Sequence, residues 1–392
     1  MRAFVVDAEW APRPGTHLSS EEEATRTVAH GGQVWRNPTG TLIDRPDPHP
    51  APGEVVLRVG ATGICGTDLN ILKLDEAGYT THDAHSHYPI VTGHEIAGTV
   101  VERGHGVTTL SVGQLVAVES MNWCGVCDAC RRGLFNQCLD LKEPGLTYDG
   151  GFAEYVAVPA KHCYPLDELL ESGTSAATAV QHGALVEPVG VAFNALFLTA
   201  GGFRPGSHAA VFGAGPVGLA AVSLLRAAGA AQVICFETSP QRRELARQCG
   251  ADSVIDPVVL SAEGRRGEEI IMGLTKGRGV GVVAECSGAT GAVYPIIEGA
   301  LGLAAKVVQI GIGHAKGHVD LFAYQTKAAQ LVGSIGQSGC GIYPDVISLI
   351  ATGRVDVSPI ITHQLSLNRI SDGLAAAADG AAGKVLIVSE AG

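Results

Sequence analysis

The sequence predicts an α/β fold with two domains, a β-rich domain and a doubly wound parallel sheet. A chain of 392 residues exceeds what one hydrophobic core usually organises, so two domains are expected. Short β-branched runs between glycine turns, at 98–104 and 113–119, indicate a small β-rich barrel. After residue 188, strands alternate with helices, a pattern typical of a parallel doubly wound sheet.

The elements follow in order along the chain. Residues 1–7 predict a strand, and the polar, proline-rich stretch 11–51 predicts a solvated surface insertion. Residues 54–68 read as a strand that feeds a loop, and 189–199 have helical spacing. The final β-run, 383–390, returns to the first domain. The predicted domains are therefore 1–188, 189–333 and, completing the first, 334–392.

Composition excludes several classes of protein. Hydrophobic residues make up 46% of the chain and charged residues 17%, which describes a well-buried globular protein. The formal charge of −12 argues against nucleic acid and anionic membranes as partners. No apolar stretch reaches the roughly 18–20 residues needed to span a bilayer. Without a secretory leader pattern at the N-terminus, a cytoplasmic location is expected.

Four cysteines lie in one short stretch with the spacing C-x2-C-x2-C-x7-C, namely Cys124, Cys127, Cys130 and Cys138. A loop with this spacing can wrap four thiolates around one Zn²⁺. A disulfide cluster is the alternative, but a reducing cytosol favours metal. Because four thiolates leave no open ligand position, this zinc is predicted to be structural.

A second set of metal-ligand types is spread along the first domain. Cys65 and Thr67 follow a strand in "GICGTD", His94 and Glu95 are adjacent, and Glu187 precedes the second domain. One thiolate, one imidazole and one or two carboxylates can hold a zinc ion with an exchangeable position. The set therefore predicts a catalytic zinc site.

The run Gly213-Ala-Gly215-Pro216-Val217-Gly218 is a G-x-G-x-x-G loop between a predicted strand and a predicted helix. In this context the first glycine makes the tight turn and the second lets backbone approach a pyrophosphate. The third packs helix on strand, and the helix N-terminus faces the phosphate charge. The loop predicts a dinucleotide site.

Glu237 lies 19 residues beyond that loop, at the end of the next strand. An acid there accepts from the ribose 2′-hydroxyl and repels a 2′-phosphate, which favours NAD over NADP. Arg242 and Arg243 nearby leave that choice open. Ser287 and Gly311, at later strand ends, are further candidates to line the cofactor.

Taken together, these motifs resemble the zinc-containing medium-chain dehydrogenase/reductase superfamily. The matching elements are "GICGTD", "GHE", the four-cysteine lobe, "VEP", "GAGPVG" and "VGS", and they cover almost the whole chain. "GHE" with "VEP" is similar to the polyol, sugar and threonine dehydrogenase branch. The segments "DAEWAPRPG", "QVWRNP", "ALVEPVGVAFNA" and "GSIGQSGCGIYPDVISLIATG" resemble cyclitol-oxidising members of it.

The resemblance implies a GroES-like catalytic domain, with a structural zinc lobe at about 120–140, and a Rossmann domain. It implies zinc- and NAD-dependent oxidation of a secondary hydroxyl of a cyclitol, polyol or aminocyclitol to a ketone, in a homo-oligomer. Cys65, His94 and Glu95 would hold the catalytic zinc, while Glu187 would be a fourth ligand or would hold a bound water. Thr67 would contact the substrate oxygen. The alternatives are an acyclic polyol, sugar or threonine dehydrogenase, an NADP-dependent reductase, or a non-catalytic member.

The sequence departs from the family pattern at one place. The family often has a histidine at the position of Asn70, where it passes the proton to solvent. Asparagine does not titrate near neutral pH, so a relay that ends there is excluded. Water or one of His82, His85 and His87 is the predicted replacement.

Overall fold

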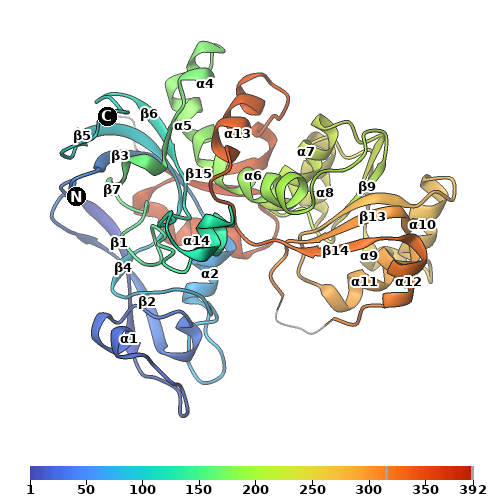
Figure 1. The fold of residues 1–392 in the computed structure, drawn as a ribbon, viewed down its shortest axis with the longest axis horizontal. Helices are drawn as coiled ribbons and strands as arrows, with labels where there is room; N and C mark the ends of the chain where they lie inside the picture. Colours follow the sequence, from blue (N-terminus) through green and yellow to red (C-terminus); the bar gives the residue numbers. More distant parts are fainter. Residues whose placement is uncertain (314–316, 390–392) are drawn as a thin grey trace.

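The structure is a computed structural model that describes residues 1–313 and 317–389. Figure 1 shows two lobes, one built around a β-barrel and one around a parallel sheet. Both chain ends lie in the barrel lobe. The predicted fold class is confirmed.

The barrel lobe is a seven-stranded sheet in which strands from both ends of the sequence meet. Its order is β15-β16-β3-β5-β6-β8, and β7 pairs with the outer part of β3. The strands are β3 (Glu54–Gly63), β5 (Glu95–Arg103), β6 (Leu115–Val118), β7 (Tyr155–Pro159), β8 (Cys163–Pro165), β15 (Ile361–Ser366) and β16 (Lys384–Val388). Alternating valines of β3 and β5 fill its core. The last strand therefore completes the barrel, as predicted.

A smaller sheet corrects the expectation for residues 11–51. It consists of β1 (Arg2–Trp10), β2 (Trp35–Asp44) and β4 (Ile90–Val91), with β1 central, and the short helix α1 (Ser20–Thr25) lies in the same segment. Trp35 is only 1% exposed and packs edge-on against Trp10 and Tyr88. The segment is thus folded onto the barrel lobe, because its one aromatic residue, Trp35, completes a buried aromatic cluster with Trp10 and Tyr88 that the segment's polar composition hides.

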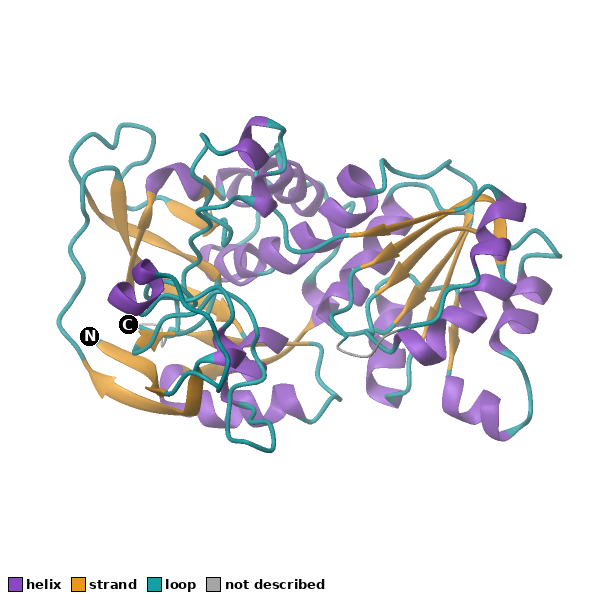
Figure 2. Cartoon of the chain, turned by 60° about the horizontal axis from the view of Figure 1, so that its bottom comes forward, coloured by secondary structure: helices purple, strands orange, loops and turns teal. Residues whose placement is uncertain are grey.

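The second lobe is a six-stranded, fully parallel sheet in the order β11-β10-β9-β12-β13-β14. Figure 2 shows its strands fanning between layers of helices. The strands are β9 (His208–Phe212), β10 (Gln232–Phe236), β11 (Ser253–Ile255), β12 (Val280–Glu285), β13 (Leu301–Gln309) and β14 (Gln330–Gly333). The helices are α7 (Pro216–Ala227), α8 (Pro240–Gln248), α9 (Pro257–Ala262), α10 (Gly267–Leu274), α11 (Thr290–Gly299) and α12 (Leu321–Lys327). The chain order reverses between β9 and β12, the switch point where such sheets bind ligands.

Helices connect the two lobes. They are α4 (Asp167–Glu171), α5 (Ala176–Ala184), α6 (Val186–Phe193), which continues as a π-helical turn (Asn194–Thr199), and α13 (Ile342–Ala351). The short helices α2 (Gly66–Leu72), α3 (Asp128–Arg131) and α14 (Ile370–Ala378) belong to the barrel lobe. Helix α13 packs against α6 and α4, so the returning chain meets the barrel beside the predicted site. The domain limits at residues 188 and 333 stay a prediction.

Among the described residues, no single helix is long and apolar enough to cross a membrane. One bent pair, Ala176–Ala184 with Val186–Thr199, passes the test of length and composition.

Candidate functional site

Strand pairing brings the first three predicted metal ligands together. Strands β3 and β5 run antiparallel with Gly63 opposite Glu95, so Cys65, two residues past Gly63, comes beside His94. One ligand atom from each of Cys65, His94 and Glu95 lies within 4.8 Å of the others. Gly63 makes this possible, since a Cβ there would lie 1.9 Å from the Glu95 carboxylate.

The chemistry of this group fits a divalent cation. The Nδ1 atom of His94 and the Oε2 atom of Glu95 are buried and have no hydrogen-bond partner in the described part of the chain. Burial lowers the pKa of His94, but the charges of Cys65, Asp68 and Glu187 and a hydrogen bond with Cys65 together outweigh it, so the pKa is raised well above its usual value. The site therefore concentrates negative charge and unpaired lone pairs, which a metal ion would satisfy.

A buried lysine holds the other side of Glu95. Lys384 opens β16 and is 1% exposed. Its Nζ donates to Glu95 Oε1 at 2.5 Å and to the carbonyl of Ile64 at 2.9 Å. One carboxylate oxygen is thus fixed by the protein while the other faces the metal group.

Glu187 lies outside the group of three ligands that approach within 4.8 Å. It is buried in the first turn of α6, and the hydroxyl of Ser120 donates to its Oε1 at 3.1 Å. The amide of Gln337 donates in turn to Ser120 Oγ at 3.2 Å. Burial raises the pKa of Glu187, and the charge of Glu95 raises it further. The two roles predicted for Glu187 therefore both stay open.

Thr67 lies at the start of α2, beside the metal group. Its hydroxyl oxygen is 3.7 Å from Cys65 Sγ, which donates to it. The turn is capped by Asp68, whose Oδ2 accepts from the backbone N–H of Cys65 at 2.8 Å. Because Asp68 does the capping, the Thr67 hydroxyl is left available to a ligand.

The loop that carries the three predicted relay histidines contacts Asn70 through the two threonines that precede them. The hydroxyls of Thr80 and Thr81 both donate to the Asn70 carbonyl at 3.1 Å, so the loop packs on α2. His82 comes next; it is 8% exposed, and its Nε2 has no partner among the described residues. His87 instead lies 3.3 Å from Thr27, and His85 lines a pocket facing α1.

The four cysteines of the lobe converge as predicted. One sulfur from each of Cys124, Cys127, Cys130 and Cys138 lies within 4.8 Å of the others. All ten cysteines of the chain are free, which removes the disulfide alternative. Backbone N–H groups of Cys130 and Leu139 lower the pKa of the Cys127 thiol to about 6. Four converging sulfurs, one readily ionised, fit a tetrahedral zinc site.

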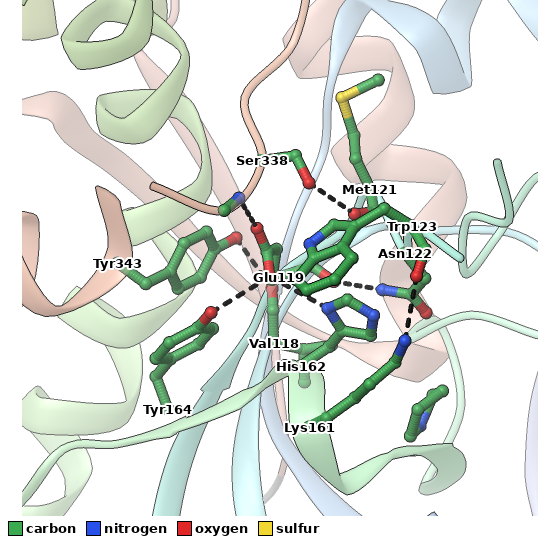
Figure 3. A network of polar contacts seen from close by, with 12 residues as sticks. Val118, Glu119, Met121, Asn122, Trp123, Lys161, His162, Tyr164, Ser338 and Tyr343 are labelled. Atoms are coloured by element: carbon green, nitrogen blue, oxygen red, sulfur yellow. Dashed lines mark hydrogen bonds and ion pairs between the residues drawn. The ribbon is translucent and has the colours of Figure 1, made fainter. Parts of the chain in front are cut away.

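A buried network ties this lobe to the returning chain. Glu119, at the end of β6, accepts from His162 Nδ1 at 2.9 Å, from the Tyr164 hydroxyl at 3.2 Å and from the backbone N–H of Gly339. Ser338 donates to the carbonyl of Met121 at 2.9 Å. Figure 3 shows these side chains closing around the Glu119 carboxylate, with Trp123 of the lobe beside His162. The network fixes the segment that also carries Gln337.

The predicted dinucleotide loop has the geometry that the motif requires. Gly213 has a φ of +88°, which favours glycine, and a Cβ on Gly218 would come 1.9 Å from the Gly213 carbonyl oxygen. Gly215 caps α7, with Pro216 and Val217 in the first turn. A Cβ on Gly215 would meet only the Arg242 guanidinium, at 4.0 Å, so the helix N-terminus is open. Arg242 lies where it can add positive charge to the phosphate side.

Glu237 stands at the end of β10, against this loop. Its Oε2 accepts from Ala214 N–H at 2.6 Å and its Oε1 from Ser239 N–H at 2.8 Å. The carboxylate lines a pocket of about 600 Å³ with apolar walls that include Val258 and Ile296. A pocket of this kind, next to a G-x-G-x-x-G loop, fits an adenosine.

Ser287 and Gly311 lie at the ends of β12 and β13, on the same edge of the sheet. Ser287 packs against Gly213, since a Cβ added to Gly213 would be 3.0 Å from the Cβ of Ser287. Glu285 is fully buried and organises both turns: its Oε1 accepts from Ser287 N–H at 2.8 Å, and its carbonyl accepts from Gly311 N–H at 2.7 Å. The structure therefore brings every predicted cofactor residue to one edge.

Comparison with known families agrees with this geometry. Residues 51–168 match the alcohol dehydrogenase GroES-like domain, and residues 216–352 match the zinc-binding dehydrogenase domain. Scyllo-inosose 3-dehydrogenase from Thermotoga maritima is 38% identical over 383 residues, covering 95% of each chain. The chain belongs to the zinc-binding dehydrogenase family. The predicted superfamily, and the predicted resemblance to its cyclitol-oxidising members, are confirmed.

Solved structures of zinc-binding dehydrogenases share the whole fold. A provisionally assigned alcohol dehydrogenase from Thermotoga maritima has a TM-score of 0.93 and 37% identity, covering 99% of this chain and all of that one. A zinc-binding dehydrogenase of Sinorhizobium meliloti 1021, also provisionally assigned, is bound to NADP; it has a TM-score of 0.75 and 27% identity over 92% of this chain and 98% of that one. This zinc-binding dehydrogenase therefore uses zinc and a nicotinamide cofactor on a small-molecule substrate.

Two residues that position other site residues were not predicted from the sequence. They are Lys384, which holds Glu95, and Glu285, which holds the turns of Ser287 and Gly311. Lys384 was hidden in an apolar strand, where a lone lysine, "GKVLIV", was the available signal. Glu285 likewise ends an apolar strand, "VGVVAE". A charged residue within a buried strand needs a partner, but the sequence does not say which.

Proposed function

We propose that this enzyme oxidises a secondary hydroxyl of a cyclitol or related polyol to a ketone, with NAD as hydride acceptor. The observation that carries the proposal is the group formed by Cys65, His94 and Glu95, where the end of β3 meets the start of β5. The similarity to scyllo-inosose 3-dehydrogenase over almost the full chain supports the cyclitol class.

Cys65, His94 and Glu95 would hold the catalytic zinc, with Glu187 either ligating it or holding a water. When bound there, zinc supplies Lewis-acid chemistry that makes a substrate hydroxyl easier to deprotonate. Thr67 would accept a hydrogen bond from that hydroxyl and pass its own proton on toward solvent as the substrate proton moves to it, since its hydroxyl lies beside Cys65 and is not used in capping. A nicotinamide cofactor bound at the edge of the parallel sheet would supply the hydride acceptor.

The proton leaves the site without a histidine at position 70. Of the three histidines considered, His82 lies in the loop that packs on Asn70 and has an unpartnered ring nitrogen. We propose that His82, or water held by it, replaces the usual relay. Replacing Asn70 by His should then change the pH–rate profile, and an unchanged profile counts against a relay at this position.

The cofactor is proposed to be NAD and not NADP. A carboxylate at Glu237 would repel a 2′-phosphate. Arg243 pairs with Asp256 at 2.8 Å, so its charge is offset, while Arg242 Nε donates to the Ala382 carbonyl at 2.8 Å and its guanidinium stays on the phosphate side of the loop, near Gly215.

We further propose two zinc ions per subunit, the second held by the four lobe cysteines. A homo-oligomer is also proposed, because β14 is an edge strand, with Leu331 on it 40% exposed and Ile335 just beyond it 53% exposed. The cytoplasmic location stays a prediction.

A metal-ligand variant tests the proposal. Cys65→Ser should abolish oxidation of every alcohol and lower bound zinc from two ions to one, while NADH binding, followed by fluorescence, is retained. Cys340→Ser is the matched control, since that thiol is exposed and outside both sulfur sites. Full activity in Cys65→Ser would overturn the proposed site.

A further inference from the structure

One carboxylate near the candidate zinc site has no partner. The side chain of Glu143 makes no hydrogen bond or ion pair within residues 1–313 and 317–389, and it is half-buried. Its backbone alone holds it: the N–H donates to the Thr147 hydroxyl at 2.8 Å, and the carbonyl accepts from Thr147 N–H at 2.9 Å. Glu143 is also outside the metal group.

The segment around Glu143 is anchored on one side beside Glu187. Lys142 pairs with Asn122 through two backbone hydrogen bonds of 2.8 and 3.1 Å. Asn122 comes two residues after Ser120, the residue whose hydroxyl donates to Glu187. The residue before Glu143 is therefore fixed next to the strand end that orients Glu187.

On the other side the segment is anchored beside His94. Gly145 has a φ of +81°, and a Cβ on it would lie 2.7 Å from the backbone nitrogen of Gly93, the neighbour of His94. Only glycine allows so close an approach. Glu143 is thus held between the backbone next to His94 and the strand end whose Ser120 hydroxyl donates to Glu187.

The surroundings of Glu143 make a carboxylate without a hydrogen-bond donor unfavourable. Burial raises the pKa of Glu143 to about 7, with His94 lowering it and Glu187 raising it, so the carboxyl group lies within the field of both. A partly desolvated carboxylate beside a second one needs a hydrogen-bond donor. The described residues supply none, and neither carboxylate oxygen is closed off from solvent, so a ligand that enters beside the candidate zinc group can reach Glu143 and donate to it.

We propose that Glu143 determines substrate specificity by accepting a hydrogen bond from a hydroxyl or protonated amine of the substrate, other than the hydroxyl being oxidised. The inference rests on the proposed function, because a cyclitol carries such groups on carbons next to the reacting one. A simple alcohol has nothing to offer this carboxylate. Glu143 would therefore select polyhydroxylated or aminated rings.

Matched substrates and variants test this. Glu143→Gln and Glu143→Ala are compared with Asp140→Asn, an exposed acid in the same segment. Substrates are an inositol, an aminocyclitol and cyclohexanol, which has the same ring with a single hydroxyl. Glu143→Ala should lower kcat/KM for the cyclitols by about tenfold to a hundredfold and leave cyclohexanol within about twofold. Asp140→Asn should leave all three unchanged.

The glutamine variant separates the two donors. A hydroxyl can still donate to the amide oxygen, so Glu143→Gln should keep part of the rate if the donor is a hydroxyl. If the donor is an ammonium group, Glu143→Gln should lose as much as Glu143→Ala, because the charge is gone. The dissociation constant of the inosose product with NADH, measured by calorimetry, should rise in parallel.

Two results overturn the inference. Equal losses for cyclohexanol and the cyclitols would show a general role at the zinc site, and no loss in either variant would show no role. Failure of the proposed function can be told apart from failure of the Glu143 inference, because it appears in the wild-type enzyme. In that case the wild type neither oxidises nor binds any cyclitol, and both the proposed function and the role of Glu143 are overturned. Zinc content and thermal midpoint of each variant confirm that the fold is retained.

Discussion

At the residue scale, the candidate catalytic group divides the Glu95 carboxylate between a protein partner and the side that faces the other two candidate ligands. Glu95 gives one oxygen to Lys384 at 2.5 Å and leaves the other unpartnered beside Cys65 and His94. Both Lys384 and Glu95 are 1% exposed. In such a place, removing one member of an ion pair leaves an uncompensated buried charge.

Lys384→Met should therefore destabilise the enzyme strongly. Breaking a buried pair costs about 3–5 kcal/mol. The loss should be greatest after chelation, because bound zinc supplies a second cation for Glu95. Chemical unfolding of wild type and variant, each with and without chelator, measures this.

Arg369→Met is the control for this prediction. Arg369 pairs with Asp372 at 2.8 Å on the surface, where both side chains are about 60% exposed, and such a pair contributes at most about 1 kcal/mol. If Lys384→Met costs no more than Arg369→Met, the buried pair does not stabilise the site.

His82 gives a pH-dependent prediction. Burial lowers the pKa of His82 from 6.5 to about 4. Between these pH values the unfolded chain binds a proton that the folded chain does not, so stability falls as the pH drops. His82 should contribute a loss on the order of 3 kcal/mol by pH 4.

His82→Gln should remove that contribution and flatten the stability profile across this range. The readout is the unfolding free energy at several pH values between about 4 and 7. Identical profiles in wild type and variant would show that the His82 ring takes up its proton equally in both states.

The ligand types at this scale could be read from the sequence, because Cys65 and His94 follow strand ends in recognisable runs. Lys384 and Glu143 could not. Lys384 acts through contacts with residues far away in the chain, and Glu143 gains its place only when its segment packs beside Gly93, while the pairing of β16 with β3 that places Lys384 depends on the folded barrel. A sequence pattern carries no record of such distances.

At the element scale, the cysteine lobe is expected to depend on its metal. Cys127→Ser should lower the zinc content from two ions to one and make residues 120–140 sensitive to protease, because the lobe contains little secondary structure beyond α3. The parallel sheet should still bind NADH. Zinc analysis and limited proteolysis measure this.

Cys163→Ser is the matched control, since Cys163 is buried in the barrel core and lies outside both metal groups. It should keep two zinc ions. Two ions retained in Cys127→Ser would mean that the lobe is not a zinc site.

Elements with strong local signals were predicted well. The strand, glycine loop and helix at 208–227 appear as β9 and α7, since propensity and pattern agree there. The insertion at 11–51 was mispredicted. Its strand β2 pairs with β1 across residues 11–34, and its core is three aromatic rings, Trp10, Trp35 and Tyr88. The prediction followed the polar composition of residues 11–51, and the few aromatic positions that form the core were too sparse to change it.

At the scale of the whole molecule, the barrel brings the zinc ligands and the parallel sheet brings the cofactor edge. The returning chain crosses between them through Gln337, Ser338 and Gly339, which bond to β6 and to the residues that follow it. This arrangement supports one active site, formed where the candidate metal group of the barrel lobe faces the cofactor edge of the parallel sheet. Which polyol enters it is the part that the family alone does not decide.

Turnover across a substrate panel tests the central claim most directly. NAD⁺ reduction is measured with inositols, inososes, aminocyclitols, sorbitol and threonine, and repeated with NADP⁺ and with a zinc chelator. The account predicts strong oxidation of a cyclitol with NAD⁺ that the chelator abolishes. Activity confined to sorbitol or threonine would contradict the cyclitol assignment, and chelator-resistant turnover would contradict the role given to Cys65, His94 and Glu95.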